Sequence, residues 1–149
     1  MDYSQITADL FVGTTPFSEN YDELRSQGIT LVINMRWDQP PYPDAYTPAM
    51  HTLWLRTFDF PVFPIPIKAL MKGVKAALDD IRKGGKVYAH CKAGSHRGVA
   101  MGAAVLIAQG YSAEEAMQLL KQQREVADPD IWYIRNRILK FEQVWQAGH

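Results

Sequence analysis

Apolar and polar positions along this chain follow two distinct periods. Short apolar runs predict strands over 10–13, 29–35, 51–56 and 86–90. Apolar positions three and four residues apart predict a helix over 67–82, and capping residues, stop residues or an apolar run predict further helices over 18–27, 98–109, 112–124 and 129–146. The run 29–35 is apolar enough for a strand that is covered on both faces. This order predicts a single-domain α/β sandwich, in which helices flank a mainly parallel sheet of about four to five strands.

Loops follow three of the predicted strands, at 36–50, 57–66 and 91–97. Prolines punctuate the first two, so we expect both to be irregular. The carboxyl ends of parallel strands meet at one edge of a sheet, and ligands bind beyond that edge. We therefore expect the functional side chains to lie in these loops.

The loop from Cys91 to Arg97 has the residues of an anion-binding site and leads into a long apolar helix. Successive N–H groups of such a loop can converge on an anion, and the helix N-terminus adds partial positive charge. The planar fork of Arg97 suits phosphate, and the same field should favour the nucleophilic thiolate form of Cys91. A phosphate held beside a thiolate is poised for phosphoryl transfer to sulfur. The expected phosphate-binding residues are Lys92, Ala93, Gly94, Ser95, His96 and Arg97.

Size, charge and cysteine content narrow the function further. The chain has 149 residues, which suits one domain over 1–149. Its 16 Lys and Arg residues balance 16 Asp and Glu residues, so no strong positive field favours nucleic acid. We see neither a signal peptide nor an apolar run of membrane-spanning length. A single cysteine excludes an internal disulfide and suits a reducing compartment. We expect a cytoplasmic monomer that uses no metal and no cofactor.

The motif His90-Cys91-x5-Arg97 resembles the signature of the cysteine-dependent protein tyrosine phosphatases, and the chain's size resembles their small dual-specificity branch. The likeness extends over nearly the whole chain, although the C-terminal helices are similar only in layout. It implies hydrolysis of phosphate monoesters through a phosphocysteine intermediate, on protein phosphotyrosine and secondarily on phosphoserine or phosphothreonine. Phosphate, sulfate or vanadate should bind in the same loop. Rhodanese-type sulfurtransferases also cradle an anion near a cysteine, but typically in a loop one residue shorter.

The resemblance assigns roles to individual residues. Cys91 would attack phosphorus, while Arg97 and the loop amides would hold the phosphoryl oxygens. Asp59 lies on a loop upstream of the cysteine, where the family places its general acid. Asp38 and Asp44, in the neighbouring loop, are the alternatives for that role.

Two supporting residues flank the motif. His90 would orient the cradle through hydrogen bonds. Gly98 departs from the family pattern, which usually has Ser or Thr there, with a hydroxyl that hydrogen-bonds the cysteine sulfur. We therefore expect breakdown of the phosphocysteine to be slower by roughly 10- to 100-fold.

The substrate is left open. Lys92 resembles the residue after the cysteine in phosphatases that act on phosphoinositides, whereas Ser95 stands where those enzymes often have a second lysine. A phosphoinositide or other non-protein phosphatase is therefore one alternative. A phosphate-binding module with weak turnover is the other, and Gly98 favours it.

Aromatic residues in or beside 36–50 are candidates for the wall of a phosphotyrosine pocket, with ordinary loop packing as the alternative. The candidates are Trp37, Tyr42 and Tyr46, together with Arg36. Elsewhere, we expect Arg124 to be a cation at a helix C-terminus, with a role in the site as the alternative. We expect Trp132 to pack in the core.

Overall fold

The computed structural model describes residues 1–149 and has a five-stranded sheet at its centre. The strands are β1 (Tyr3–Gln5), β2 (Leu10–Gly13), β3 (Ile29–Arg36), β4 (His51–Thr57) and β5 (Lys86–His90). They lie in the order β1-β2-β5-β3-β4, and every neighbouring pair is parallel except β1 with β2. The predicted fold class is confirmed. The short antiparallel strand β1 was not expected, because its three residues carry no clear apolar alternation.

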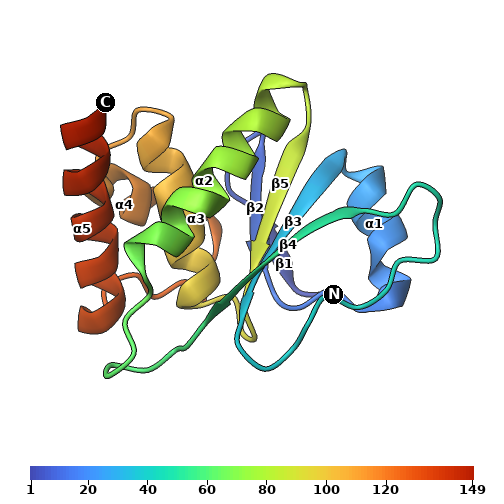
Figure 1. The fold of residues 1–149 in the computed structure, drawn as a ribbon, viewed down its shortest axis with the longest axis horizontal. Coiled ribbons are helices and arrows are strands. Elements are labelled where there is room, and N and C mark those ends of the chain that lie inside the picture. Colours follow the sequence, from blue (N-terminus) through green and yellow to red (C-terminus); the bar gives the residue numbers. More distant parts are fainter.

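Helices cover the two faces of the sheet unequally (Figure 1). One face carries only the short helix α1 (Tyr21–Ser26), which follows a single 3-10 turn at Ser18–Asn20. The other carries α2 (Ile67–Arg82), α3 (Arg97–Ala108), α4 (Ala113–Gln123) and α5 (Trp132–Gly148). None of these helices combines the length and the hydropathy that a bilayer crossing requires.

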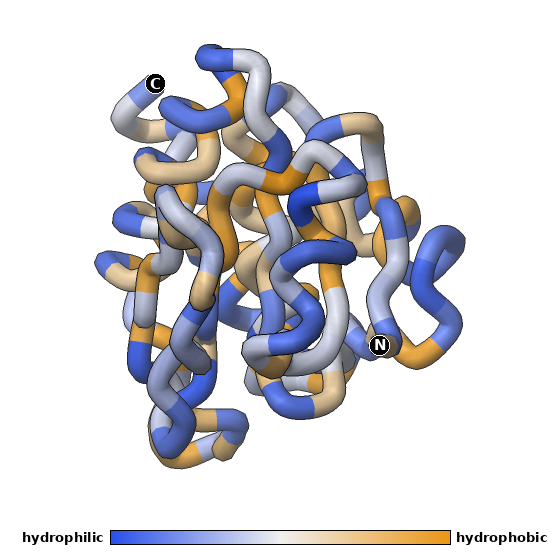
Figure 2. The backbone as a smooth tube through the Cα atoms, turned by 90° about the vertical axis from the view of Figure 1, so that its right-hand side faces the viewer, coloured by the Kyte–Doolittle hydropathy of each residue, from blue (hydrophilic) through white to orange (hydrophobic).

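The alternating side chains of the strands divide the interior into two cores. In β5, Val87 and Ala89 face the large core under α2 to α5, whereas Tyr88 faces the small core under α1. Helix α3 is buried through almost its whole length at the centre of the large core, as its apolar sequence predicts. Figure 2 shows the hydrophobic segments gathered inside the molecule, with hydrophilic loops around them.

Most helix boundaries agree with the sequence signals. Ser112 and Glu115 form the predicted capping box, in which each side chain accepts a hydrogen bond from the other residue's backbone N–H. The last helix differs, because it begins at Trp132 rather than near Pro129. The expectation that Trp132 packs in the core is wrong, since 62% of its surface is exposed.

The four parallel strands end together at one edge of the sheet. Gly13 is level with His90, and His90 is level with Asn34 on the other side. Arg36 is in turn level with Thr57 at the end of β4. The loops that leave these strands therefore share one side of the molecule, the lower side in Figure 1.

Candidate active site

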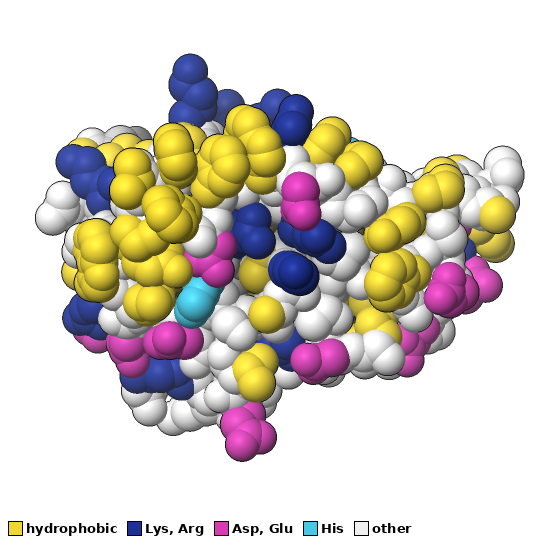
Figure 3. Space-filling model, turned by 90° about the horizontal axis from the view of Figure 1, so that it is seen from below, with side chains coloured by type: hydrophobic (Ala, Val, Ile, Leu, Met, Phe, Trp, Pro, Cys, Tyr) yellow, Lys and Arg dark blue, Asp and Glu magenta, His cyan; other side chains and the backbone are white.

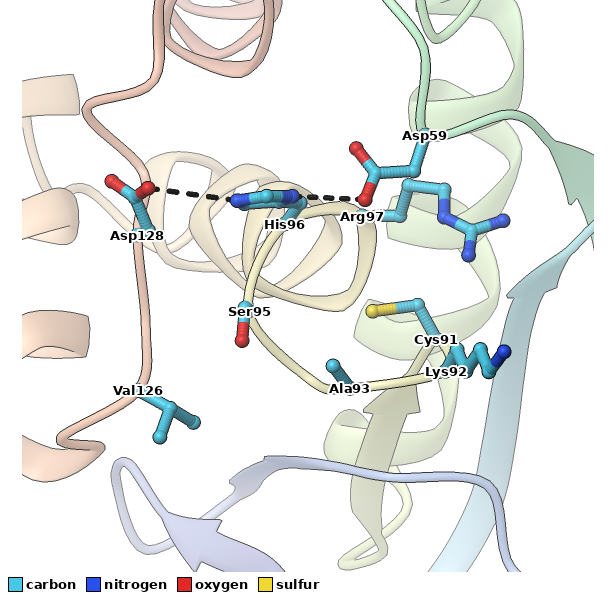
Figure 4. Close-up of a pocket in the computed structure, with 9 residues that line it drawn as sticks. All are labelled: Asp59, Cys91, Lys92, Ala93, Ser95, His96, Arg97, Val126 and Asp128. Atoms are coloured by element: carbon cyan, nitrogen blue, oxygen red, sulfur yellow. Dashed lines mark hydrogen bonds and ion pairs between the residues drawn. The ribbon is translucent and has the colours of Figure 1, made fainter.

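The loop between β5 and α3 curves around a cavity of about 500 Å³ at this edge (Figure 4). The lining residues are Asp59, Cys91, Lys92, Ala93, Ser95, His96, Arg97, Val126 and Asp128. In Figure 3, Lys and Arg side chains gather at the centre of this face, and acidic side chains lie around them. The structure thus brings the predicted nucleophile, most of the predicted phosphate-binding residues and the predicted acid to one cavity.

Cys91 lies at the base of this cavity. Only 3% of its surface is exposed, yet its Sγ points into the arc of the loop (Figure 4). Its carbonyl oxygen accepts a hydrogen bond of 3.2 Å from the Thr15 hydroxyl, which holds the start of the loop. The sulfur is therefore reachable only by a group that enters the cavity.

The guanidinium of Arg97 is tied down on one edge and open on the other. Its Nη1 donates to the carbonyl oxygen of Thr57 at 2.8 Å and to that of Met35 at 3.3 Å. Its Nε is buried and has no hydrogen-bond partner within the protein. Because a buried N–H without a partner is costly, this open edge indicates a site for an anion.

The backbone of the loop is oriented for anion binding from behind. Arg124, directly after α4, donates from Nε to the Gly94 carbonyl at 2.8 Å and from Nη2 to the Ala93 carbonyl at 3.1 Å. In a trans peptide the carbonyl and the following N–H point in opposite directions. With both carbonyls turned to Arg124, the N–H groups of Gly94 and Ser95 are turned towards the cavity.

Gly94 permits this path because its φ is +68°, and a side chain there would meet the Gly13 carbonyl at 2.8 Å. Arg124 does end helix α4, as expected, but its side chain is almost fully buried behind the loop, which favours the alternative of a role in the site. Asp2 accepts hydrogen bonds from the far side of the same guanidinium. No sequence signal links Arg124 to a loop some thirty residues earlier, since tertiary folding alone brings them together.

Asp59 stands on the rim of the cavity. Its Oδ2 lies 2.9 Å from Nδ1 of His96, and its Oδ1 accepts a 2.8 Å hydrogen bond from the Tyr133 hydroxyl. The residue before it, Phe58, stacks on Trp37 with ring centroids 4.2 Å apart. The carboxyl group and its loop are thus held at the mouth of the cavity.

The alternative acids lie outside the cavity and are paired with arginines. Hydrogen bonds from Arg25 lower the pKa of Asp44 to about 2. A hydrogen bond from Arg36 likewise lowers the pKa of Asp38. A general acid must hold a proton near neutral pH, so neither environment suits that role.

His90 is buried directly beneath the cavity. Its Nδ1 lies 3.4 Å from the Cys91 carbonyl oxygen. Burial lowers the pKa of His90 to about 3, so the imidazole stays neutral at physiological pH. It is placed to support the loop and does not add charge to it.

Gly98 follows Arg97 in the first turn of α3 and packs against the start of the loop. A Cβ at this position would lie 3.2 Å from the backbone nitrogen of Cys91 and from two backbone atoms of His90. The backbone therefore approaches the helix more closely than most side chains allow, and the site has no hydroxyl at this point.

Arg36 supports the cradle and does not line the cavity. Its Nη1 donates to the Thr15 hydroxyl at 3.1 Å, and Thr15 in turn holds the Cys91 carbonyl. The other atoms of its guanidinium bind Asp38. These contacts favour a supporting role for Arg36 over a place in a substrate wall.

The three aromatic candidates also lie outside the lining of the cavity. Trp37 packs on Phe58 of the acid loop. Tyr42 packs on Phe17, and Tyr46 lies beneath the guanidinium of Arg25. The structure therefore favours the alternative of ordinary loop packing for Tyr42 and Tyr46, which lie against Phe17 and Arg25.

Comparison with known proteins agrees with this geometry. The family described as dual specificity phosphatase, catalytic domain, matches residues 10–143. Mouse dual specificity phosphatase 28 is 30% identical over 148 residues, which cover 97% of this chain and 86% of that protein. A crystal structure of human DUSP28 matches with a TM-score of 0.87 at 26% identity, over 98% of this chain and 99% of that one. A crystal structure of PTPMT1 matches with a TM-score of 0.85 at 25% identity, over 98% of this chain and 97% of that one. The chain therefore belongs to the dual specificity phosphatase family, as its motif indicates, and is a cysteine-dependent phosphatase.

Proposed function

We propose that this phosphatase acts on protein phosphotyrosine, and secondarily on phosphoserine or phosphothreonine, with Cys91 as nucleophile and Asp59 as general acid. One observation supports the residue roles above all others. Cys91 and Arg97, whose buried Nε has no partner within the protein, line the same cavity, and the Asp59 carboxyl group stands on its rim. A module that only binds phosphate would need neither the nucleophile nor the acid.

In the first step the phosphate group of the substrate lies in the loop, with its oxygens on the Arg97 fork and the loop amides. The Cys91 thiolate attacks phosphorus, so an S–P bond forms while the bond from phosphorus to the leaving oxygen breaks. Asp59 gives its proton to that oxygen. Fixed donors around the phosphoryl oxygens stabilise the spreading charge and need no reorganisation.

In the second step a water molecule attacks phosphorus and the S–P bond breaks. The Asp59 carboxylate takes a proton from this water, inorganic phosphate forms, and Cys91 returns to the thiolate. Gly98 provides no hydroxyl to stabilise the departing sulfur, so this step is the slow one in our proposal.

A turnover panel tests the substrate class. It compares phosphotyrosine, phosphoserine and phosphothreonine peptides with phosphoinositides and nucleotides, and Cys91→Ser serves as the blank. We expect the highest kcat/KM on phosphotyrosine peptides. A preference for nucleotides would contradict the proposal.

Asp59→Asn tests the acid. We expect it to lower kcat/KM by about 10²- to 10⁴-fold on a phosphotyrosine peptide, and far less on an aryl phosphate with a good leaving group. An equal loss on both substrates would contradict the acid role.

Phosphoinositides are the second candidate substrate, and two observations favour them. Lys92 lines the cavity, where it can add positive charge for a polyphosphorylated headgroup. PTPMT1, whose fold this chain shares, has been solved in complex with PI(5)P. The panel decides between the candidates, because turnover of PI(5)P in vesicles above that of phosphotyrosine peptides would favour the lipid.

The same cradle should bind free oxyanions. We expect vanadate, sulfate and phosphate to compete with substrate, because each presents tetrahedral oxygens to the Arg97 edge. We further propose that the chain works as a monomer in the cytoplasm. The free thiol supports the compartment, since a catalytic cysteine must stay reduced.

A further inference from the structure

The Asp59 carboxylate has one partner on each oxygen, and the two come from different helices. Oδ2 faces His96, the N-cap residue of α3, at 2.9 Å. Oδ1 accepts from the hydroxyl of Tyr133, in the first turn of α5, at 2.8 Å. Three segments far apart in the sequence thus converge on the group that must deliver a proton.

We propose that Tyr133 is a positioning residue for the leaving-group acid: its hydroxyl holds Oδ1 of Asp59, so that Oδ2 is the oxygen that carries the proton to the substrate. The inference rests on the proposed role of Asp59. Tyr133 does not line the cavity, so it acts through Asp59 and not on the substrate.

The direction of this hydrogen bond is defined. Burial, followed by the hydrogen bond to Asp59, raises the pKa of Tyr133 to about 12. The phenol therefore keeps its proton throughout the working pH range and donates to Oδ1 whether or not Asp59 is protonated.

His96 has a different role, because it faces the oxygen that must reach the leaving group. Its Nδ1 contacts Oδ2, and its Nε2 lies 3.5 Å from Oδ2 of Asp128. Figure 4 shows the imidazole between the two carboxylates. When substrate binds, the leaving oxygen replaces His96 at Oδ2 of Asp59, and Oδ1 stays on Tyr133. During the reaction the O–H bond at Oδ2 breaks as the O–H bond of the leaving group forms.

The ring of Tyr133 is held by packing that does not involve its hydroxyl. It meets His96 edge to face, with centroids 6.1 Å apart, and meets Trp132 in the same manner at 5.7 Å. Tyr133→Phe keeps these contacts and removes only the hydroxyl. Because the Asp59 side chain is 33% exposed, the lost hydrogen bond should have a moderate effect and not an extreme one.

The test measures kcat/KM of Tyr133→Phe on phenyl phosphate, a poor leaving group, and on 2,4-dinitrophenyl phosphate, a good one. This ratio reports the steps up to departure of the leaving group, so slow breakdown of the phosphocysteine does not mask it. We expect roughly a tenfold loss on phenyl phosphate and almost none on the dinitrophenyl ester. Tyr111→Phe, which removes an exposed hydroxyl without a hydrogen bond, is the matched control and should change neither value.

A double-mutant cycle completes the test. In an Asp59→Asn background, Tyr133→Phe should cost nothing further on phenyl phosphate, because its effect passes through the lost carboxyl group. Three outcomes would overturn the positioning role. Tyr133→Phe could lower kcat/KM equally on both esters, could lower it as much in the Asp59→Asn background as in the wild type, or could leave it unchanged. If Asp59→Asn itself leaves the hydrolysis of phenyl phosphate unchanged, the acid role fails, and the role of Tyr133 fails with it.

Discussion

The step from phosphocysteine to free thiolate depends on what surrounds a single sulfur atom. In our proposal, Arg97 and the loop amides hold the phosphoryl oxygens in both steps, but they do not stabilise the sulfur as it departs. Gly98 stands where the family usually has a Ser or Thr, and a Cβ there would lie 3.2 Å from the backbone of His90 and Cys91. The missing hydroxyl and the close approach of the backbone are therefore two effects of one residue.

Gly98→Ser should raise kcat, and Gly98→Ala separates the two effects. Both add a Cβ that lies 3.2 Å from the loop backbone, but only Ser adds a hydroxyl. We expect the kcat of the Ser variant to exceed both the kcat of wild type and the kcat of the Ala variant by about tenfold or more. The burst rate of intermediate formation should barely change. Stopped-flow and steady-state assays on p-nitrophenyl phosphate measure both rates. No gain in kcat for Ser would contradict the slow-breakdown hypothesis.

His90 links the protonation of one buried ring to stability. Its pKa is about 3 in the folded chain and near 6.5 when unfolded, so the unfolded state binds the extra proton between these values. The stability that depends on neutral His90 is complete above pH 6.5 and is lost as the pH falls towards 3. At about 1.4 kcal/mol per pH unit, the contribution lost at pH 5 is about 2 kcal/mol.

Urea unfolding at pH 7 and pH 5 measures this difference. His90→Gln cannot take up the proton, so its free energy of unfolding should fall less over the same interval. If the free energy of unfolding falls equally in the variant and the wild type between pH 7 and pH 5, other groups cause the acid sensitivity.

The cradle takes its shape from elements that lie outside it. The Asp128 backbone N–H donates to the Ser95 carbonyl at 2.9 Å, and Thr15 holds the carbonyl of Cys91. Arg124 holds two further carbonyls and connects them to Asp2 and to Ser4 of β1. Segments before β2, after β2 and after α4 thus fix the backbone of one short loop. Such fixed dipoles are more effective than mobile ones, because they need not reorganise when charge develops.

Arg124→Lys should weaken anion binding although it keeps the charge. A lysine cannot hold two carbonyls with a planar fork, so the amides of Gly94 and Ser95 lose their fixed direction. We expect a roughly 10- to 100-fold loss of kcat/KM and weaker inhibition by vanadate. Asp2→Asn removes only the distal, exposed charge, so it should change kcat/KM and the inhibition by vanadate by a few-fold at most. Unchanged vanadate inhibition in Arg124→Lys would contradict this account of the loop.

The chain contains one cysteine, and it is the nucleophile in our proposal. Oxidation of Cys91 to the sulfenic acid therefore cannot be followed by a disulfide within the molecule. The remaining routes are a sulfenamide with the backbone or a mixed disulfide with another molecule. Because the sulfur is reached only through the cavity, an anion bound there should shield it.

Peroxide should inactivate the enzyme, and inorganic phosphate should slow the loss. Intact mass spectrometry should show no internal disulfide in the inactivated protein, and a thiol reductant should restore activity if the oxidation has stopped at a reversible stage. Inactivation at the same rate with and without saturating phosphate would contradict access through the cavity alone.

Prediction from sequence succeeded where the signal is local. Strands β2 to β5, the capping box at Ser112 and the path from β5 through the loop to α3 each depend on residues close together in the chain. It failed at Trp132, where a helical stripe indicated burial but the helix begins only there and leaves the ring in solvent. It could not decide the place of Tyr42, because a loop's aromatic residues do not indicate which side the loop folds towards.

The sequence alone determined the chemistry of the site, because the residues that carry it are neighbours in the chain. One strand–loop–helix unit holds a nucleophile, a run of amides and a guanidinium, and such a unit forms an anion site wherever it is placed. The supports of this site were not specified in that way. Arg124 behind the loop and Tyr133 beside Asp59 are distant in the chain from what they hold. Their contacts exist only once the helices pack on the sheet, and contacts made by packing leave no periodic signal along the sequence.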